Sequence, residues 1–169
     1  MSRSSIISEW FHQYSHDIYN FLVYYTGNTE VEDLVQEVFI KAIKGLHTYE
    51  SRSSPKTWLF SIARNVAVDE ARKRKSKVWH LTRPLNEDEK YDGQTPEELL
   101  YDNEEKRYLY TAIQALRKNY REVLLLRGLQ ELTVKETAAV LNWREDKVRT
   151  TYHRALKTLR KQQGGYRYE

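Results

Sequence analysis

Apolar side chains recur at steps of three and four residues near the start of the chain. This spacing places them on one face of a helix and predicts an amphipathic α-helix that ends near the sequence TGNT. The residues that share the stripe are Trp10, Phe11, Tyr14, Ile18, Phe21, Leu22 and Tyr25.

Two more helices are predicted before residue 77. Thr29 with Glu32 matches a capping box that predicts where the second helix begins. For the third helix, Ser54 is placed as the N-cap, and Pro55 occupies the first helical position, where proline is favoured. The apolar positions are Val31, Val35, Val38, Ala42 and Leu46 in the second helix and Leu59, Ile62 and Val66 in the third. We predict that these three helices form one domain over residues 1–77.

The helical periodicity fades between residues 78 and 103. Pro84, Gly93 and Pro96 fall in this range and are typical of turns and linkers. The overlapping stretch NEDEKYDGQTPEELLYDNEE has the acidic composition of a solvated segment. We predict a flexible acidic linker over residues 78–103.

A second helical pattern fills residues 104–169. The sequence KNYREV is predicted as a corner and VLLLRGL as a short buried helix. Thr133 with Glu136 gives another capping box, which opens a helix that runs through Leu141. Residues 141–143 are predicted as a tight turn into a last helix, which ends before the two glycines at 164 and 165. The first apolar stripe of this domain consists of Leu109, Ile113 and Leu116.

The last two predicted helices have the arrangement of a helix-turn-helix, whose second helix enters the major groove of DNA. That second helix has two distinct faces. Its apolar side carries Val148, Tyr152, Ala155 and Leu159, and its opposite side carries Arg149, Thr150, His153, Arg154 and Lys157. Cations with short polar donors suit contacts to phosphates and base edges, although a solvated helix of a bundle has a similar face.

Composition agrees with an all-α protein of two small helical domains. Only 3 prolines and 6 glycines interrupt 169 residues. The absence of cysteine excludes a disulfide framework and fits a reducing compartment. The apolar runs are too short to cross a bilayer, and the first residues lack the apolar core of a signal peptide. We therefore expect a cytoplasmic protein with no segment inserted in a membrane.

The net charge of +4 hides two basic zones on either side of an acidic one. The net charge is −4 over residues 1–51, +6 over 52–77, −7 over 78–105 and +9 over 106–169. Basic zones concentrate the capacity to bind phosphates, but charge blocks are also common on ordinary solvated surfaces. Sequence motifs are therefore needed to distinguish a phosphate-binding surface from an ordinary solvated one.

Three long motifs follow one another along the chain, separated by the acidic linker. They are EDLVQEVFIKAI, KTWLFSIARNVAVDEARKRK and LTVKETAAVLNWREDKVRTTYHRALKTLRK. In this order they resemble the extracytoplasmic-function (ECF) sigma factors, small bacterial initiation factors of the sigma-70 family that keep only domains 2 and 4. The resemblance runs from about Trp10 to Lys161 and is greatest to the X-type members of Gram-positive bacteria. It implies sigma domain 2 over residues 1–77 and a helix-turn-helix sigma domain 4 over residues 104–169.

The resemblance implies that the second helix binds core RNA polymerase. In the family this helix grips the clamp helices of the β′ subunit, and domain 4 contacts the β flap. The side of the helix opposite the core includes an isoleucine among charges, which is unusual for a solvated face, although an ordinary acidic surface is the alternative. The implied residues are Asp33, Gln36, Glu37 and Ile40.

The third helix and the loop before it are implied to recognise and melt the −10 promoter element. Melting requires groups that stabilise an unstacked base and cations that hold the flanking phosphates. In the family, the loop at residues 51–56 and the position of Asn65 receive a flipped base. Two roles stay open for Trp58, contact with DNA and packing in the core. The implied residues are Ser51, Arg52, Ser53, Ser54, Lys56, Trp58, Asn65, Asp69, Arg72, Lys73 and Arg74.

The last helix is implied to read the −35 element. Arg149 and Arg154 are expected to make the principal contacts, because arginine can bind guanine in a bidentate manner. The supporting residues are Lys147, Thr150, His153 and Lys157. Two departures from the family pattern lie nearby: Thr137 occupies a position that is usually apolar, and Trp143 with Arg144 replaces a small turn. We expect the Thr137 hydroxyl to bond back along its helix, and the altered turn leaves the promoter preference open.

The resemblance also implies the partners. They are core RNA polymerase, promoter DNA and an anti-sigma protein, which in the family is often bound to the membrane. The factor would direct promoter-specific initiation by recognising the −35 and −10 elements and melting DNA. We expect no cofactor, no metal and no enzymatic activity, because the chemistry belongs to the polymerase.

Other functions are less well supported by the residues. His12 and His16 have the spacing of metal ligands beside Asp17, but no further ligand cluster follows. The chain has no glycine-rich phosphate loop and no nucleophile elbow. The main alternative is a stand-alone helix-turn-helix transcriptional regulator, which has no need of a melting segment or an exposed Ile40. A module that only sequesters another factor would leave the basic zones without a purpose.

Overall fold

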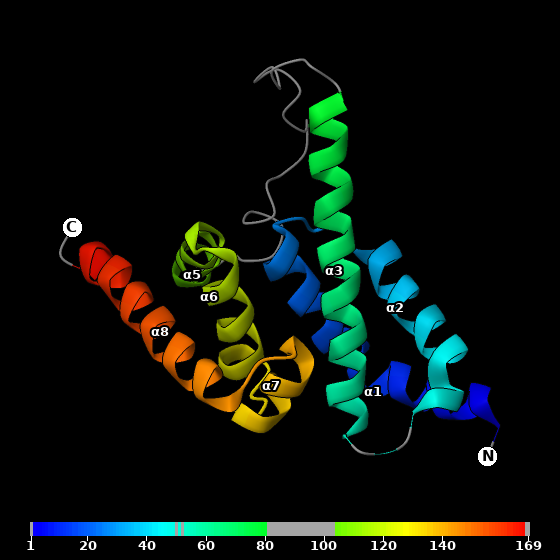
Figure 1. The fold of residues 1–169 in the computed structure, drawn as a ribbon. Helices are drawn as coiled ribbons and strands as arrows, with labels where there is room; N and C mark the ends of the chain where they lie inside the picture. The colour runs from blue at the N-terminus through cyan, green and yellow to red at the C-terminus, as the bar shows by residue number, and fades with distance from the viewer. Residues whose placement is uncertain (1, 50, 52, 81–103, 168–169) are drawn as a thin grey trace.

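A computed structural model describes residues 2–49, 51, 53–80 and 104–167, and the regular elements within these ranges are all helical. Figure 1 shows two groups of helices side by side. The first group contains α1 (Arg3–Thr26), α2 (Glu32–Gly45), the 3-10 helix η1 (Leu46–Thr48) and α3 (Pro55–His80). The second contains α5 (Glu104–Ala115), α6 (Lys118–Val123), the π-helical segment η3 (Leu124–Leu129), α7 (Val134–Leu141) and α8 (Glu145–Arg167). The all-α prediction is confirmed.

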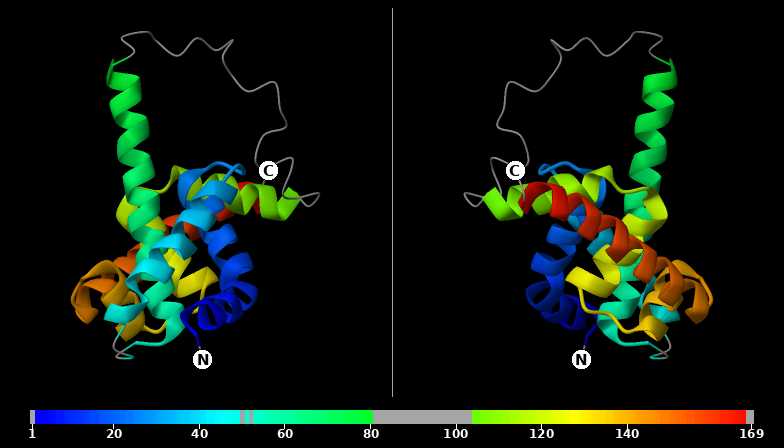
Figure 2. Two further views of the ribbon diagram at one scale, coloured as in Figure 1. Left: turned by 90° about the vertical axis from the view of Figure 1, so that its right-hand side faces the viewer. Right: turned by 90° about the vertical axis from the view of Figure 1, so that its left-hand side faces the viewer.

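The segment predicted as a linker begins inside a helix. Residues 78–80 form the end of α3, which projects beyond the rest of the molecule (Figure 2). Residues 81–103, the remainder of the predicted linker, lie outside the described residues. The division of the chain at residues 77 and 103 therefore stays a prediction.

In the first group, α1, α2 and α3 pack against one another through the predicted apolar stripes. Ile18, Val38 and Leu59 are completely buried. Phe11 is the exception, because it lies at the edge of the α1 stripe and 42% of its surface is exposed. Helix α1 ends at Gly27, whose left-handed backbone (φ 72°) is favoured in glycine and whose N–H donates to a carbonyl of the last turn.

The helix starts were predicted with mixed success. At α3, the N-cap is confirmed, since the Ser54 hydroxyl accepts the N–H of Thr57 at 3.1 Å. The capping box at residues 29 and 32 was wrong. Helix α2 begins at Glu32 itself, preceded by Val31 without a side-chain cap. Thr29 thus lies two residues before the cap position, in a turn where the Asn28 side chain accepts the N–H of Glu30 at 2.9 Å.

The second group contains the predicted helix-turn-helix in α7 and α8. The capping box of α7 is confirmed by reciprocal bonds between Thr133 and Glu136 at 2.9 and 3.0 Å. The turn is confirmed as well, with Asn142 in the left-handed conformation (φ 57°).

Two local predictions in this group were wrong, and one was confirmed in part. The sequence KNYREV forms helix α6 rather than a corner. The sequence VLLLRGL is helical and buries three leucines, as predicted, but it is a π-helical continuation of α6 and leaves Leu129 43% exposed. Helix α8 runs past the two glycines to Arg167, because a glycine inside a helix costs only about 1 kcal/mol and does not by itself end it.

The two groups pack together, and we call this packing the closed arrangement. Helix α7 lies against α3, and the end of α1 lies against α5. The rings of Tyr24 and Tyr110 are in contact with centroids 5.4 Å apart, and the Gln114 side chain donates to the carbonyl of Tyr24. A side chain at Gly27 would approach Gln114 to 2.9 Å, so glycine also permits this close approach.

A buried carboxylate joins three helices across the closed arrangement. Glu122 of α6 is 1% exposed and accepts the hydroxyl of Tyr25 (α1) at 2.5 Å and the guanidinium Nε of Arg64 (α3) at 3.2 Å. Burial raises the pKa of the Tyr25 hydroxyl, and its hydrogen bond to Glu122 raises it further. Tyr25 is therefore neutral and acts as a donor at physiological pH.

The Thr137 side chain does not make the predicted bond back along α7. Its hydroxyl is completely buried and has no hydrogen-bond partner within the described ranges. We expect Thr137→Val to stabilise the protein by about 1 kcal/mol, because the substitution keeps the branched shape and removes an unpaired polar atom. The urea midpoint measures this change. As a matched control, Thr133→Val removes the cap of the same helix and should lower stability by about 1 kcal/mol. An unchanged or lower midpoint for Thr137→Val would contradict the prediction.

Candidate nucleic-acid interface and partner surface

The outer face of α2 combines carboxylates with an exposed isoleucine. Asp33, Gln36 and Ile40 are exposed, with Ile40 at 49%, while Glu37 is partly exposed and pairs with Lys41 at 3.4 Å. These positions face away from the core because the opposite stripe of α2 is buried. We call Asp33, Gln36, Glu37 and Ile40 the α2 surface. Its mixed composition suits a partner that offers both apolar and basic groups.

Two apolar residues near the α2 surface were not predicted as functional. Ile43 of α2 is 47% exposed, and Phe11 of α1 packs edge-on against Phe39 of α2 with ring centroids 5.0 Å apart. The spacing of Ile43 and Ile40 on one helix was the available signal for Ile43. For Phe11 no local signal existed, because its helix periodicity places it with core residues.

The residues predicted to recognise the −10 element lie in the loop before α3 and along α3; we call them the −10 segment. Ser51 has a left-handed backbone (φ 57°), and the Ser53 carbonyl accepts the hydroxyl of Tyr49 at 2.5 Å. These features bend the loop and fix its end next to Ser54, the cap of α3. Arg52 lies outside the described residues.

The exposed side of α3 carries the remaining polar members of the −10 segment. Asn65, Asp69, Arg72, Lys73 and Arg74 are all exposed. Arg74 forms an ion pair with Glu70 at 3.4 Å. Because α3 projects from the molecule (Figure 2), its basic end can be reached by a large partner. The spacing therefore aligns an amide and several cations along one accessible helix.

Trp58 lies in an aromatic cluster rather than on the open side of α3. Its ring is 5.1 Å from that of Tyr49 and 6.0 Å from that of Trp10, and the Trp10 and Tyr49 rings are also in contact. The side chain is half-buried against the core. Of the two roles left open for Trp58, these contacts favour packing.

In the closed arrangement the second group of helices contacts the start of the −10 segment. The Lys56 ammonium donates to the carbonyl of Gln130 at 2.9 Å. One carboxylate oxygen of Glu136 accepts the hydroxyl of Thr57 at 2.9 Å and that of Ser54 at 3.4 Å. The backbone N–H of Thr133 holds the pKa of this carboxyl below its ordinary value, so Glu136 is ionised at neutral pH. An anionic group thus occupies the loop predicted to receive DNA.

The outer face of α8 is cationic, as predicted. Its members Lys147, Arg149, Thr150, His153, Arg154 and Lys157 are all exposed, and we call them the α8 face. Arg149 lies 3.7 Å from Glu145 in an exposed ion pair. The Lys147 ammonium lies 4.2 Å from the centre of the Trp143 ring, so this turn residue positions a cation of the α8 face.

A shallow cavity of about 480 Å³ connects the α8 face to the start of α6. Lys147, Thr150 and Arg154 line it from α8, and it is also lined by Arg117, Asn119, Tyr120, Arg144, Asp146 and Thr151. The cation Arg117 immediately precedes the segment predicted as a corner, and its position beside α8 could not be inferred from sequence. Clustered guanidinium and ammonium groups with hydroxyls form a surface suited to DNA phosphates and base edges.

Neither a metal site nor a membrane helix is evident in the described ranges. No group of three or more His, Cys, Asp or Glu side chains is arranged there to hold a metal ion. None of the helices described is both long and apolar enough to cross a membrane.

Family models match two separate parts of the chain. Sigma-70 region 2 matches residues 10–77, and Sigma-70 region 4 matches residues 106–159. The α2 surface and the −10 segment fall in the first match, and the α8 face falls in the second.

Relatives of known function match most of the chain. The ECF RNA polymerase sigma factor SigX of Bacillus subtilis is 40% identical over 152 residues, covering 88% of this chain and 78% of the relative. The ECF RNA polymerase sigma factor SigM of the same organism is 34% identical and covers 91% and 93%.

Solved structures share the fold. The sigma factor RpoE of Bartonella quintana, in complex with the anti-sigma factor NepR, matches with a TM-score of 0.76 at 21% identity, covering 93% of this chain and 96% of that one. CnrH in complex with the cytosolic domain of CnrY matches with a TM-score of 0.68 at 18% identity, covering 96% and 90%.

Proposed function

The chain belongs to the ECF group of sigma-70 RNA polymerase sigma factors. From this membership we propose which step of transcription initiation each of its surfaces performs. Residues 1–77 act as domain 2, residues 78–103 as an acidic linker and residues 104–169 as domain 4. The observation that carries the proposal is the placement in one chain of an acidic surface with an exposed Ile40 and two separate cationic surfaces.

The α2 surface binds the clamp helices of the β′ subunit, and domain 4 contacts the β flap. The −10 segment stabilises an unstacked base with its loop and Asn65, while Arg72, Lys73 and Arg74 hold the flanking phosphates. The α8 face reads the −35 element. Run-off transcription with core polymerase on a promoter library tests the proposal, because a stand-alone regulator would bind duplex DNA tightly and yield no polymerase-dependent transcript.

The closed arrangement must open before this function is possible. Ser54 and Lys56 are bonded to domain 4, so the loop cannot receive a base while these contacts persist. Separate contacts to two promoter elements also require the domains to move apart on the polymerase. Core polymerase and promoter would thus select an open state of the factor.

The proposed partners include an anti-sigma protein. A solved structure with this fold, the sigma factor RpoE, is in complex with an anti-sigma factor, which supports a similar partner here. A protein that binds the closed arrangement would keep the −10 segment covered. We place the factor in the cytoplasm, where its polymerase acts, and assign it no enzymatic activity of its own.

Arg154 is proposed as the principal −35 contact, because it lines the cavity beside α8 and forms no ion pair within the described part of the chain. We expect Arg154→Ala to weaken holoenzyme binding by about 1 to 3 kcal/mol and to relax the preference at one base pair. Binding to a library of −35 variants measures both effects. Lys157→Ala is the matched control, since loss of a phosphate contact should weaken binding evenly and reduce the salt dependence. Equal losses on every −35 sequence for Arg154→Ala would contradict base readout.

A further inference from the structure

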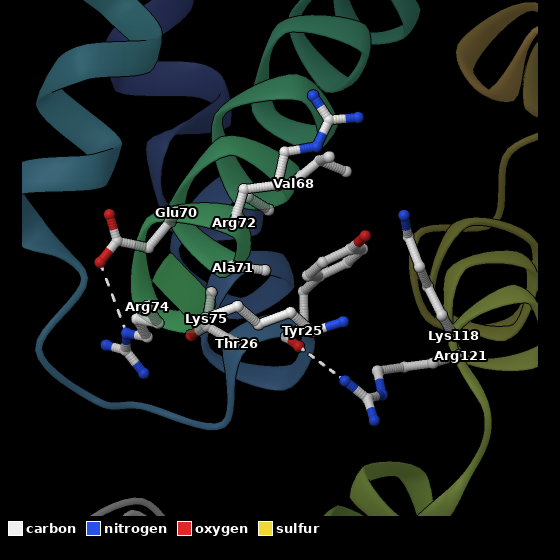
Figure 3. A pocket seen from close by; sticks show the side chains of 11 residues that line it. Tyr25, Thr26, Val68, Glu70, Ala71, Arg72, Arg74, Lys75, Lys118 and Arg121 are labelled. Atoms are coloured by element: carbon white, nitrogen blue, oxygen red, sulfur yellow. Dashed lines mark hydrogen bonds and ion pairs between the residues drawn. The ribbon is translucent and has the colours of Figure 1, made fainter. Parts of the chain in front are cut away.

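A pocket of about 520 Å³ lies between the two domains. Figure 3 shows that its lining side chains come from the end of α1, from the second half of α3 and from α6. Since both domains contribute, the pocket exists in this form only in the closed arrangement. Small-molecule sites have volumes of about 300 to 1,000 Å³ and often lie at domain interfaces.

The walls of the pocket carry an excess of positive charge. Arg72 and Lys75 on α3 and Lys118 on α6 line it, and none of the three pairs with a carboxylate within the described ranges. The one acidic residue of the lining described is Glu70, whose charge is balanced by Arg74 at 3.4 Å. In Figure 3 the Arg74 side chain turns toward Glu70, while Lys118 extends from the opposite wall. An anion that enters would therefore meet three uncompensated cations.

The floor of the pocket is apolar and held in place. Ala67 and Val68 of α3 and the ring of Tyr25 are buried and contribute to it. Arg121 is also part of the lining, but its guanidinium donates to three backbone carbonyls, including that of Tyr25 at 3.1 Å. The terminal nitrogens of Arg121 thus anchor α6 to α1 and are not available to a ligand.

We propose that this interdomain pocket binds a nucleotide with at least two phosphate groups. A ligand with several anionic groups can contact cations on both walls at once, and guanidinium and ammonium groups bind phosphates through charge-assisted hydrogen bonds. The apolar floor suits the sugar or base of the same molecule. A phosphate compound without a nucleoside would contact only the cations of the walls and would leave the apolar floor uncovered.

Such a ligand favours the closed arrangement, because it binds a pocket that opening destroys. It also covers Arg72, one of the cations assigned to promoter phosphates. The nucleotide and the promoter therefore compete for the factor, a consequence that rests on the proposed function.

Titration calorimetry of the free full-length protein with ADP tests the site, with pyrophosphate and adenosine as partial ligands. We expect ADP to bind with one site per chain, pyrophosphate to bind more weakly and adenosine not to bind. Lys118→Ala should weaken ADP binding roughly tenfold, the loss of one charge-assisted contact. Lys161→Ala removes the same charge from an exposed position of α8 and should leave ADP binding unchanged.

A donor and acceptor dye pair, one on each domain, gives a second readout. In an Arg64→Ala background, where the domains are expected to separate, ADP should increase energy transfer, and adding Lys118→Ala should remove this increase. Absence of ADP binding, equal binding by Lys118→Ala, or equal loss in Lys161→Ala would overturn the proposal, the last because it indicates general attraction of polyanions. These measurements involve neither polymerase nor promoter, so a failure here is distinguishable from a failure of the sigma function.

Discussion

Ile40→Glu is expected to abolish polymerase-dependent transcription by this factor. Ile40 is half-exposed among charged residues, a position where an apolar side chain gains free energy only by burial in a partner. A glutamate there would bring an unpaired charge into the same contact. Substitution of a central interface residue of this kind costs about 2 kcal/mol or more of binding free energy. The affinity of the factor for core polymerase should therefore fall by about 30-fold or more. Run-off transcription and direct binding of core polymerase measure the loss.

The control places the same new charge elsewhere on domain 2. Gln13→Glu changes an exposed position of α1 outside the α2 surface and should transcribe normally. Normal transcription by Ile40→Glu would rule out the assignment of the α2 surface to polymerase. If transcription were lost while binding of core polymerase was unchanged, Ile40 would act at a later step of initiation.

Local signals in the sequence predicted the elements that the site requires. The stripe that buries Val38 necessarily turns Ile40 outward, because helical periodicity fixes both sides of α2 at once. The cap at Thr133 and the left-handed turn at Asn142 depend on residues within one turn of helix, so they too were predictable. The cationic face of α8 follows from the same periodicity.

Features that depend on distant residues could not be predicted. Helix α6 has six residues, too few for a periodic stripe, and it is held in place by tertiary packing. Glu122 resembles an ordinary surface glutamate in the sequence, yet its partner Tyr25 lies 97 positions away. Trp58 packs on Trp10, and Arg117 lies beside α8, for the same reason. The closed arrangement consists of such contacts, so it had no local signature.

The second large effect is expected from the carboxylate buried between the domains. Arg64→Ala should shift the free protein toward the open state. In the closed arrangement the substitution leaves Glu122 buried with Tyr25 as its remaining side-chain partner, whereas opening returns the carboxylate to water. Loss of one partner of a buried ion pair costs about 3 kcal/mol, which corresponds to a change of roughly 100-fold in the equilibrium between closed and open states.

Energy transfer between dyes on the two domains measures this shift, and it should decrease in Arg64→Ala. Arg74→Ala is the matched control, because it removes an arginine of the same helix whose partner, Glu70, belongs to the same domain and is partly exposed. Exposed ion pairs contribute about 0 to 1 kcal/mol, so the control should remain closed.

A further variant separates the buried charge from the loss of contacts in general. Glu122→Leu in the Arg64→Ala background removes the uncompensated carboxylate, and an apolar side chain of similar size fits a buried position. We therefore expect energy transfer to recover in the double variant. Arg64→Ala could open the protein while the double variant remained equally open. That result would mean that the packing of the Arg64 side chain, and not its charge, holds the domains together. If Arg64→Ala stayed closed, the apolar contacts around Tyr24 and Tyr110 would suffice, and opening would have to be driven entirely by polymerase and promoter.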